Sequence, residues 1–341
     1  MSKEEIFVKG NNKLLNKAIK REEKLERQLI RMYRKMFEEM ERDIFEVFEK
    51  YATNNKLTYQ DAIKNLTSKE FASWKMDVSE YMKEIEENGD DMLKIELETL
   101  LAKRKISRLE QLSYKLKKRL HYCFEYTNKQ VEELLEKSVM ESYEDTSKNL
   151  IKAYQFEVGL KPDEDIIFEV LNTPWSGAKF SDLIINHSRK LEGIIKNELT
   201  KGFYQGKSSQ HICKVLEGKI DKSRKEIMKV VRTERTFCQN EIQRRKYKEV
   251  GFNYYKYKAK PEQKRTCNDC AEKHNKLFKL DEAEVGENFP PLHTNCRCST
   301  VPITDRDWEK EQEKKEAYEK YKKDVEENYS EYNDKGEFEP F

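Results

Sequence analysis

Four of the seven cysteines lie close together near the carboxyl end, in a pattern typical of metal-binding sites. The pattern begins with Cys267-x-x-Cys270, a spacing that brings two thiolates together at one tight turn, and closes with His293-x-x-Cys296-x-Cys298. Structural zinc sites use two such pairs of Cys and His ligands to fill a tetrahedral shell. We therefore predict that this segment, called the knuckle here (residues 267–298), binds a structural Zn²⁺ ion as its cofactor.

The knuckle offers more candidate ligands than a tetrahedral ion requires. The favoured set is Cys267, Cys270, His293 and Cys296. The main alternative replaces His293 with Cys298, and His274 is a further reserve. A filled shell leaves no position for a reactive water, so the ion is predicted to hold the fold rather than to catalyse. Two readings without metal remain, a reduced thiol cluster in the core and a disulfide formed in oxidising surroundings. The absence of an apolar signal stretch at the amino terminus favours metal.

A single carboxylate falls on an otherwise apolar helical stripe upstream of the knuckle. The S-x-x-E spacing of Ser223 and Glu226 is typical of a capping box and predicts a helix that begins there and runs to about residue 250. Glu234 lies on its apolar face, and an unpaired buried charge is costly. Glu234 is either a catalytic or anchoring carboxylate or, as we favour, part of a structural ion pair near Arg232 and Arg235.

Residues 253–260 alternate strictly and predict a β-strand, with tyrosines and Ala259 on one face and Lys256, Lys258 and Lys260 on the other. Shorter strands are predicted at 277–280 and at 299–303, where Pro302 indicates an edge position. The lysine face either meets solvent, which we favour, or contacts the phosphates of a nucleic acid. So small a sheet would gain stability from the predicted zinc.

The rest of the chain is polar and helical in pattern. Charged residues make up 39% of the chain, and only 11 glycines and 7 prolines serve its 341 residues, so few turns and long helices are expected. Helices are predicted over 12–50, 58–62, 71–87, 91–120, 123–156, from 180 or 181 to about 202, from 208 or 209 to about 218, over 223–250 and from 307 onward. No run of about 18 apolar residues predicts a membrane span, so no membrane partner is expected. The predicted fold class is mainly α.

Breakers and charge divide the chain into three predicted domains. A turn-rich stretch around Gly159, Pro162 and Pro174 separates a helical assembly domain (1–157) from an α+β domain with a small zinc-stapled sheet (158–305). A charged helical tail (306–341) follows. Residues 1–35 carry eleven Lys/Arg against five Glu, and residues 305–341 carry fourteen Asp/Glu against eight Lys/Arg. These segments are either solvated helical faces or surfaces for a polyanion or an assembly partner.

Residues 160–305 resemble the phage head morphogenesis family, the Mu F-like minor head proteins. The matching motifs, in chain order, are Pro174-Trp175-Ser176-Gly177 with Phe180-Ser181, Gly202, Gly206-Lys207-Ser208, Arg232-Thr233-Glu234, the strand at 255–259, Lys264-Arg265-Thr266-Cys267-x-x-Cys270, and Phe289 through Cys298. Lys264 replaces the acidic residue usual before Arg-Thr-Cys, and Asn275 replaces a usual glycine. No single motif is diagnostic, but the ordered set is specific.

The resemblance implies a structural minor capsid protein of a bacteriophage or prophage, not an enzyme, that joins the portal protein during prohead assembly. Scaffold, major capsid protein and DNA are further implied partners, with a role in DNA packaging or delivery. Such a protein is made in the host cytoplasm and resides in the virion, at the portal vertex or inside the capsid. Trp175, Arg232 and Glu234 are implied to be structural residues of the domain.

Two other functions are compatible with the residues. A DNA-binding protein of the virion interior would use the basic amino-terminal helix and the Lys256/Lys258/Lys260 face. A zinc-stapled nuclease of the His-Asn-His type would need a second divalent-metal site and a histidine base, for which His274 is the nearby candidate. Arg232-Thr-Glu234 also suggests, weakly, the carboxylate of an ADP-ribosyl transferase.

Overall fold

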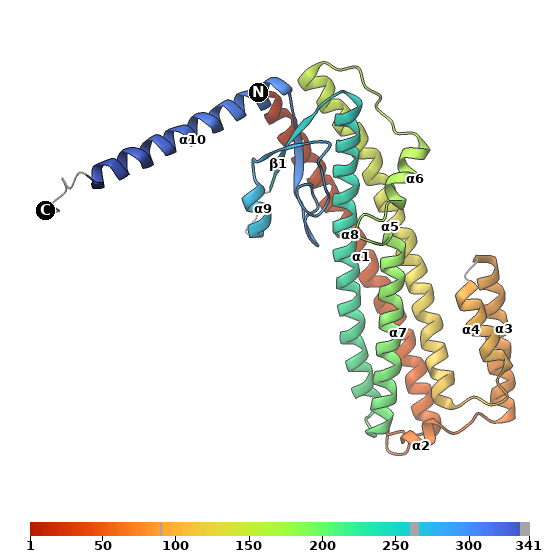
Figure 1. The fold of residues 1–341 in the computed structure, drawn as a ribbon. Helices are drawn as coiled ribbons and strands as arrows, with labels where there is room; N and C mark the ends of the chain where they lie inside the picture. The colour runs from red at the N-terminus through yellow and green to blue at the C-terminus, as the bar shows by residue number, and fades with distance from the viewer. Residues whose placement is uncertain (89–90, 260–265, 335–341) are drawn as a thin grey trace. The chain divides into compact units, whose positions relative to one another are not determined.

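The computed structural model describes residues 1–88, 91–259 and 266–334 of the chain and has the mainly α fold predicted (Figure 1). Its helices are α1 (Lys3–Tyr51), α2 (Tyr59–Ala62), α3 (Ser68–Asn88), α4 (Asp91–Ala102), α5 (Arg108–Tyr154), α6 (Glu164–Asn172), α7 (Phe180–Tyr204), α8 (Ser209–Glu249), α9 (Asn268–Lys273) and α10 (Asp305–Asp334). Its strands are β1 (Tyr254–Lys258), β2 (Leu277–Lys279) and β3 (Ser299–Ile303). Within the described residues, no helix is apolar over enough of its length to cross a bilayer.

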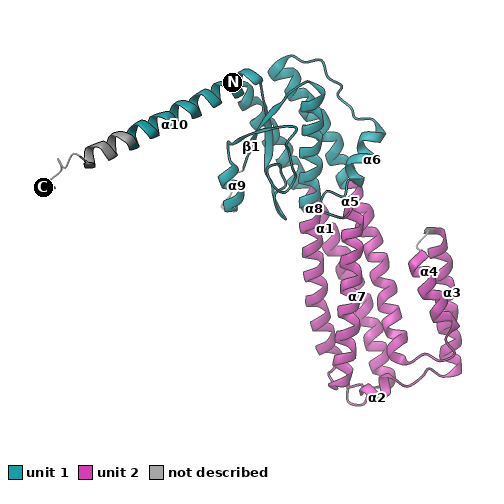
Figure 2. Cartoon of the chain, in the orientation of Figure 1, with its two compact units in different colours: residues 1–20, 134–177, 232–341 teal, residues 21–133, 178–231 magenta. Residues whose placement is uncertain are grey.

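The chain forms two compact units, each assembled from separate segments (Figure 2). The knuckle unit contains residues 1–20, 134–177 and 232–341, and the bundle unit contains residues 21–133 and 178–231. Helices α1, α5 and α8 each contribute residues to both units. The predicted domains, in contrast, are contiguous in sequence, and their boundaries at 157/158 and 305/306 remain a prediction.

The bundle unit is built on long amphipathic helices. The central part of α1 buries an apolar stripe that includes Leu29, Met40 and Ile44, all fully buried. The rings of Phe48 in α1 and Phe203 in α7 meet at 5.5 Å. The helices α3 and α4 form a hairpin with an apolar cluster of its own, to which α5 contributes. Thr58 caps α2, as predicted, by accepting a hydrogen bond from the Asp61 backbone.

The knuckle unit contains a three-stranded antiparallel sheet with the strand order β2-β1-β3. The face of β1 predicted to be apolar is buried, since both Tyr255 and Tyr257 have no exposed area. Pro302 pairs with Tyr255 from β3, which is an edge strand as the proline indicated. The strand assignments are confirmed to within two residues at each end.

The predicted helix break between residues 218 and 223 is wrong, because α8 runs without interruption from Ser209 to Glu249. Gly218 lies inside α8, where a glycine lowers helix stability by about 1 kcal/mol relative to alanine. Here Leu216, Ile220 and Ile227 around it are buried, and this packing offsets the cost. Ser223 therefore lies within a helix and does not begin one.

The predicted boundary between residues 120 and 123 is also wrong, because α4 ends at Ala102 and α5 begins at Arg108. A capping box marks the true start of α5. The hydroxyl of Ser107 accepts a hydrogen bond from the Glu110 backbone, and the Glu110 carboxylate accepts one from the Ser107 backbone. The same reciprocal pair, Thr67 with Glu70, marks the start of α3.

Candidate metal centre

The first pair of knuckle cysteines is placed by the short helix α9. Cys267 occupies the N-cap of α9, and its sulfur accepts a hydrogen bond from the backbone N–H of Cys270 at 3.4 Å. The N-cap position and the end of the first helical turn lie on the same side of a helix, so both thiols face the same space. Cys270 is buried and Cys267 is partly buried.

The second part of the knuckle brings its side chains to the same space. The Nε2 atom of His293 lies 3.1 Å from the sulfur of Cys267 and 3.3 Å from that of Cys270. The sulfur of Cys296 lies 3.9 Å from that of Cys270. The five predicted side chains thus form two groups that share Cys270, one with Cys267 and His293 and the other with Cys296 and Cys298.

The donor set has the chemistry that a tetrahedral zinc ion requires. Zinc–ligand bonds of about 2.3 Å to sulfur and about 2.0 Å to nitrogen imply S···S separations of about 3.8 Å and S···N separations of about 3.6 Å. The Cys270–Cys296 distance of 3.9 Å fits, and the two S···N distances are slightly short. The four favoured ligands do not form one group within 4.8 Å, so Cys267 and His293 would have to move relative to Cys296 to share one ion.

Hydrogen bonds around the ligands support the same geometry. The Nδ1 atom of His293 lies 2.8 Å from the carbonyl oxygen of Thr294. This contact suits the tautomer in which Nδ1 carries the proton and donates it to the carbonyl, so that Nε2 faces the thiols with its lone pair. The hydroxyl of Tyr257 donates to the sulfur of Cys270 at 3.4 Å. Hydrogen bonds from Cys270 and Cys298 lower the pKa of the Cys296 thiol. A cavity of about 340 Å³ borders the ligands.

His274, the reserve ligand, lies apart from both groups. It lines a separate cavity of about 160 Å³ together with Lys258 and Arg297. Burial lowers its pKa, and the charge of Lys258 acts in the same direction. The choice between His293 and Cys298 as the fourth ligand stays open, since Cys298 is only 6% exposed and lies within 4.8 Å of both Cys270 and Cys296.

One face of α8 holds the knuckle backbone through a series of side-chain hydrogen bonds. The hydroxyl of Thr233 accepts from the backbone N–H of Asn295 at 2.9 Å, and the hydroxyl of Thr236 donates to the carbonyl oxygen of Cys296 at 2.7 Å. Further along, Asn240 donates to the Cys298 carbonyl at 3.1 Å and Tyr247 to the Thr300 carbonyl at 3.1 Å. We call these four α8 side chains the α8 ladder. Only Thr233 is marked by a sequence motif; Thr236, Asn240 and Tyr247 are not predicted from the sequence, although the three-, four- and seven-residue steps place all four side chains on one helical face.

Glu234, the carboxylate on the apolar stripe, lies beside the ladder and is 5% exposed. It accepts a hydrogen bond of 3.0 Å from the indole N–H of Trp175, whose ring stacks on Phe237 at 5.2 Å. Two of the residues predicted to be structural are thus in direct contact. Burial raises the pKa of Glu234 to about 7, against the opposing effect of the Trp175 hydrogen bond.

The lysine face of β1 is engaged within the knuckle unit. The ammonium groups of Lys256 and Lys258 lie 2.8 Å and 2.5 Å from the two carboxylate oxygens of Glu4 in α1. Lys260 lies outside the described residues, as do Lys264 and Arg265 of the resemblance. Two of the three lysines that could meet phosphates are therefore already paired with a carboxylate.

The raised pKa predicts a pH-dependent cost of burying Glu234. A carboxyl whose pKa is about 4.5 in the unfolded chain and about 7 in the fold favours folding fully below pH 4.5, and this advantage is lost as the pH rises through 7. Glu234→Gln keeps an acceptor for Trp175 without the charge. We expect it to raise the free energy of unfolding by about 3 kcal/mol at pH 8, and by little at pH 4.5, in urea titrations.

The control for this experiment is Glu217→Gln, which removes an exposed carboxylate from the same helix. It should leave the stability difference near zero at both pH values. A pH-independent effect of Glu234→Gln would show that Glu234 is not buried as a weak acid.

Comparison with known proteins finds a family that resembles part of this chain. Residues 193–301, from α7 to β3, match the model of the family described as "Phage Mu protein F like protein". The match includes the α8 ladder and all the knuckle ligands. No solved structure matches the chain significantly.

One curated relative is similar to the chain over 156 residues with 25% identity, the NAD(+)--arginine ADP-ribosyltransferase EFV of Enterococcus faecalis (strain ATCC 700802 / V583). The similarity covers 42% of this chain but only 32% of the relative, so about two thirds of that protein has no counterpart in the match. The family match confirms the resemblance seen in the sequence over residues 193–301: this segment is similar to the phage Mu protein F like proteins, a family of phage head morphogenesis.

Proposed function

We propose that the chain is a structural minor capsid protein of a phage or prophage that joins the portal during prohead assembly. The observation that carries the proposal is the knuckle bound along α8 inside the matched region. This arrangement holds an irregular loop that carries candidate zinc ligands, and four protein ligands on one ion would suit a shape-holding element better than a catalytic one. The proposed location is the virion, at the portal vertex or inside the capsid.

The same geometry argues for a protein that acts without catalysis. Glu234 is the carboxylate that could serve an ADP-ribosyl transferase, the activity named for the Enterococcus faecalis relative. It is buried and holds Trp175, so its carboxylate is a structural contact. We extend none of that relative's activity to this chain, because the similarity leaves most of the relative unmatched.

We further propose that the knuckle binds one zinc ion through Cys267, Cys270, Cys296 and either His293 or Cys298. Metal analysis of the purified full chain is expected to give one zinc per chain, and chelation should unfold the knuckle. Cys267→Ala and Cys270→Ala should each abolish stoichiometric zinc. Whichever of His293→Ala and Cys298→Ala loses zinc identifies the fourth ligand.

The matched control is Cys213→Ala, which removes a buried cysteine of the bundle unit. It should keep one zinc per chain. A full chain that is purified without metal under reducing conditions and keeps its circular dichroism and melting temperature under chelation would contradict the zinc proposal, and would favour the reduced thiol cluster.

The assembly role predicts that the chain travels with heads. Proheads isolated from cells that produce the phage should contain the protein in few copies, and a tagged chain should retain the portal protein. Cys267→Ala/Cys270→Ala should reduce incorporation into proheads strongly, whereas Cys213→Ala should not. Quantitative mass spectrometry measures both. If the protein were absent from both virions and assembly intermediates, this would contradict the proposal.

DNA binding is a second candidate, favoured by an exposed cationic stripe on α1. Lys24, Arg27, Arg31 and Arg34 follow one another at three- and four-residue steps and are all exposed. Such steps keep a row of cations on one side of a helix, where it can follow a phosphate backbone. The stripe, rather than the β1 lysines, is the surface that we propose for DNA.

If the stripe neutralises about four phosphates, the affinity for duplex DNA should fall by about two orders of magnitude between 50 and 200 mM salt. Arg27→Glu/Arg31→Glu should weaken binding and flatten this dependence in fluorescence anisotropy titrations. Lys190→Glu/Lys214→Glu, which changes the net charge equally at exposed sites on other helices, is the control. Equal losses in both variants would exclude a specific role of the stripe.

A further inference from the structure

The hairpin of α3 and α4, called the arm here (residues 68–102), has an apolar cluster of its own within the bundle unit. Both helices supply its buried members, which are Trp74, Val78, Tyr81, Ile85, Leu93 and Leu97. Tyr114 is the buried residue that α5 adds to this cluster. Because most of the cluster lies inside the arm, the two helices can stay together without the rest of the unit.

The two chain segments that join the arm to the bundle unit are paired with each other. One leads from α2 into α3, and the other leads from α4 into α5. The backbone N–H of Leu66 donates to the carbonyl oxygen of Ile106 at 2.8 Å, and that of Arg108 donates to the carbonyl oxygen of Lys64 at 3.1 Å. The paired segments form a compact junction at one end of the arm (Figure 1).

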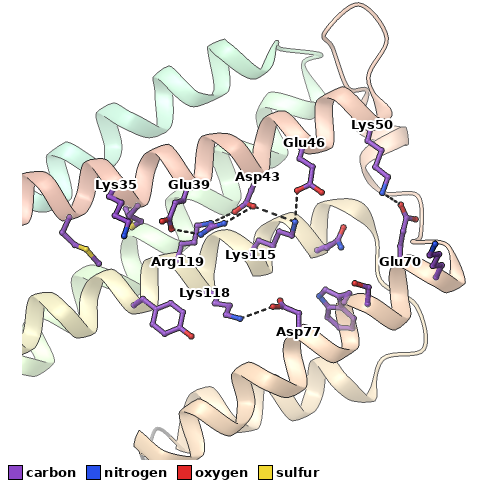
Figure 3. Close-up of a pocket in the computed structure, with 17 residues that line it drawn as sticks. Lys35, Glu39, Asp43, Glu46, Lys50, Glu70, Asp77, Lys115, Lys118 and Arg119 are labelled. Atoms are coloured by element: carbon purple, nitrogen blue, oxygen red, sulfur yellow. Dashed lines mark hydrogen bonds and ion pairs between the residues drawn. The ribbon is translucent and has the colours of Figure 1, made fainter.

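Open spaces lie on both sides of the arm. A charged groove of about 810 Å³ lies between α1, α3 and α5 (Figure 3). An apolar cavity of about 210 Å³ lies on the α4 side, lined by leucines of α4 and α5 and by Ile195 and Leu199 of α7. Closely packed helices leave few voids larger than a water molecule. The arm is therefore not closely packed on α1 or α7 along these spaces.

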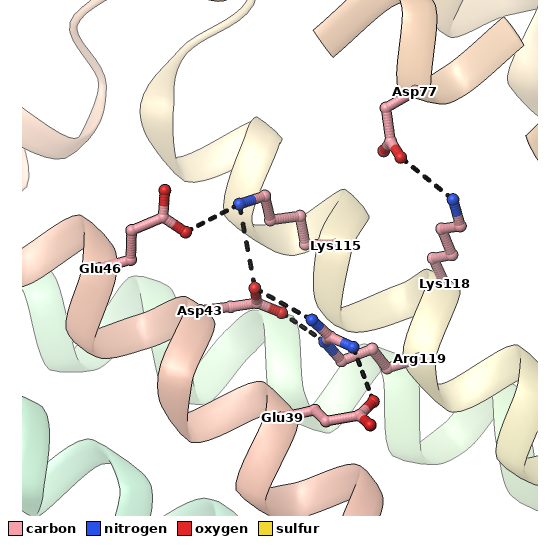
Figure 4. A network of polar contacts seen from close by, with 7 residues as sticks. All are labelled: Glu39, Asp43, Glu46, Asp77, Lys115, Lys118 and Arg119. Atoms are coloured by element: carbon pink, nitrogen blue, oxygen red, sulfur yellow. Dashed lines mark hydrogen bonds and ion pairs between the residues drawn. The ribbon is translucent and has the colours of Figure 1, made fainter. Parts of the chain in front are cut away.

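The contacts of the arm with α5 lie on about two turns of that helix. The α5 residues with a ring contact, ion pair or hydrogen bond to the arm are Tyr114, Lys117, Lys118, His121 and Tyr122. Lys118 binds Asp77 at 3.1 Å (Figure 4), and the Asp77 side chain is 46% exposed. Ion pairs as exposed as this one contribute little to stability. The arm is thus held along a narrow line of rings and weak ion pairs.

This line buries two hydrogen-bond donors without acceptors. Trp74 and Tyr81 are 3% and 2% exposed, and neither the indole N–H nor the phenol hydroxyl has a hydrogen-bond partner among the described residues. Both rings lie against Tyr114, with centroids 6.2 and 6.3 Å apart. A buried donor that has lost its bonds to water destabilises the state that buries it. Movement of the arm away from α5 would let water reach both donors.

We propose that the arm is hinged and swings away from α5 as one body about the paired segments at its base. The ring contacts and the pair of Lys118 with Asp77 hold it closed, and the two donors without acceptors oppose closure, so both states are populated. Opening uncovers an aromatic face made of Trp74, Tyr81 and Tyr114. The motion needs neither the knuckle nor a bound ion.

Distances between spin labels on the full chain test the motion. Labels on unnatural amino acids, which leave the native cysteines unchanged, replace the exposed Glu87 of the arm and the exposed Lys129 of α5. Double electron–electron resonance should give two populations for this pair. A second pair at Lys83 and Glu98, both in the arm, should keep one narrow distance. A single population for the first pair, or broadening of the second, would overturn the proposal.

Two substitutions at the contact should shift the ratio of open to closed arms in opposite directions. Tyr81→Phe removes a buried hydroxyl that has no acceptor, so it should lower the ratio at least about fivefold. Lys118→Ala removes the ion pair with Asp77 and the ammonium group 4.8 Å from the Tyr81 ring, so it should raise the ratio about threefold.

Each substitution has a matched control away from the arm. Lys115→Ala removes a cation one turn before Lys118 that binds Glu46 of α1 instead (Figure 4). Tyr33→Phe removes another buried hydroxyl without a hydrogen-bond partner among the described residues, at a contact of α1 with Phe124. Both controls should leave the ratio unchanged. A control that shifts the ratio as much as its test variant, or test variants that shift it in the same direction, would overturn the proposal.

Discussion

The hydrogen bonds from α8 to the backbone of residues 295–300 are the constraint on which the candidate site depends. A loop such as the one that carries Cys296 has few regular partners for its own N–H and C=O groups, and buried backbone groups must be paired. Thr233, Thr236 and Asn240 supply those partners from a helix whose own bonds are complete. The two knuckle cysteines of this loop are therefore positioned by α8 before any ion binds.

This arrangement accounts for the polar composition of a deeply buried helix. From Thr233 to Tyr247, α8 buries threonine, asparagine, glutamine and charged side chains that are rarely buried together. Each contact of the ladder uses one of them to hold a segment distant in sequence, and Gln243 extends the network through Asn11 of α1. Glu234 does the same for Trp175. Within the Arg232-Thr233-Glu234 motif, Thr233 contacts the knuckle backbone and Glu234 contacts Trp175 in the turn before α7.

The sequence predicted correctly the features that depend on residues close together in the chain. Alternation located the strands, because burial of one sheet face imposes a period of two, and Cys/His spacing located the knuckle, because two residues between cysteines fit one turn. The helix ends were predicted less well. The S-x-x-E signal is a true capping box at Ser107 but lies inside α8 at Ser223, since tertiary burial around Gly218 keeps that helix continuous. Spacing alone does not distinguish the two.

Pairing across long separations was the part that the sequence could not supply. The sequence shows basic residues both in β1 and along α1. In the fold, the β1 lysines pair with Glu4, whereas Arg27, Arg31 and Arg34 of α1 are exposed. Likewise, the charges around Asp43 cancel because Arg119 and Lys115 arrive from α5, whereas Lys35 on the same helix has no such partner among the described residues. A charged segment is available to a binding partner only where the fold brings no partner to it. Only the three-dimensional arrangement of α1, α3 and α5 determines where that condition holds.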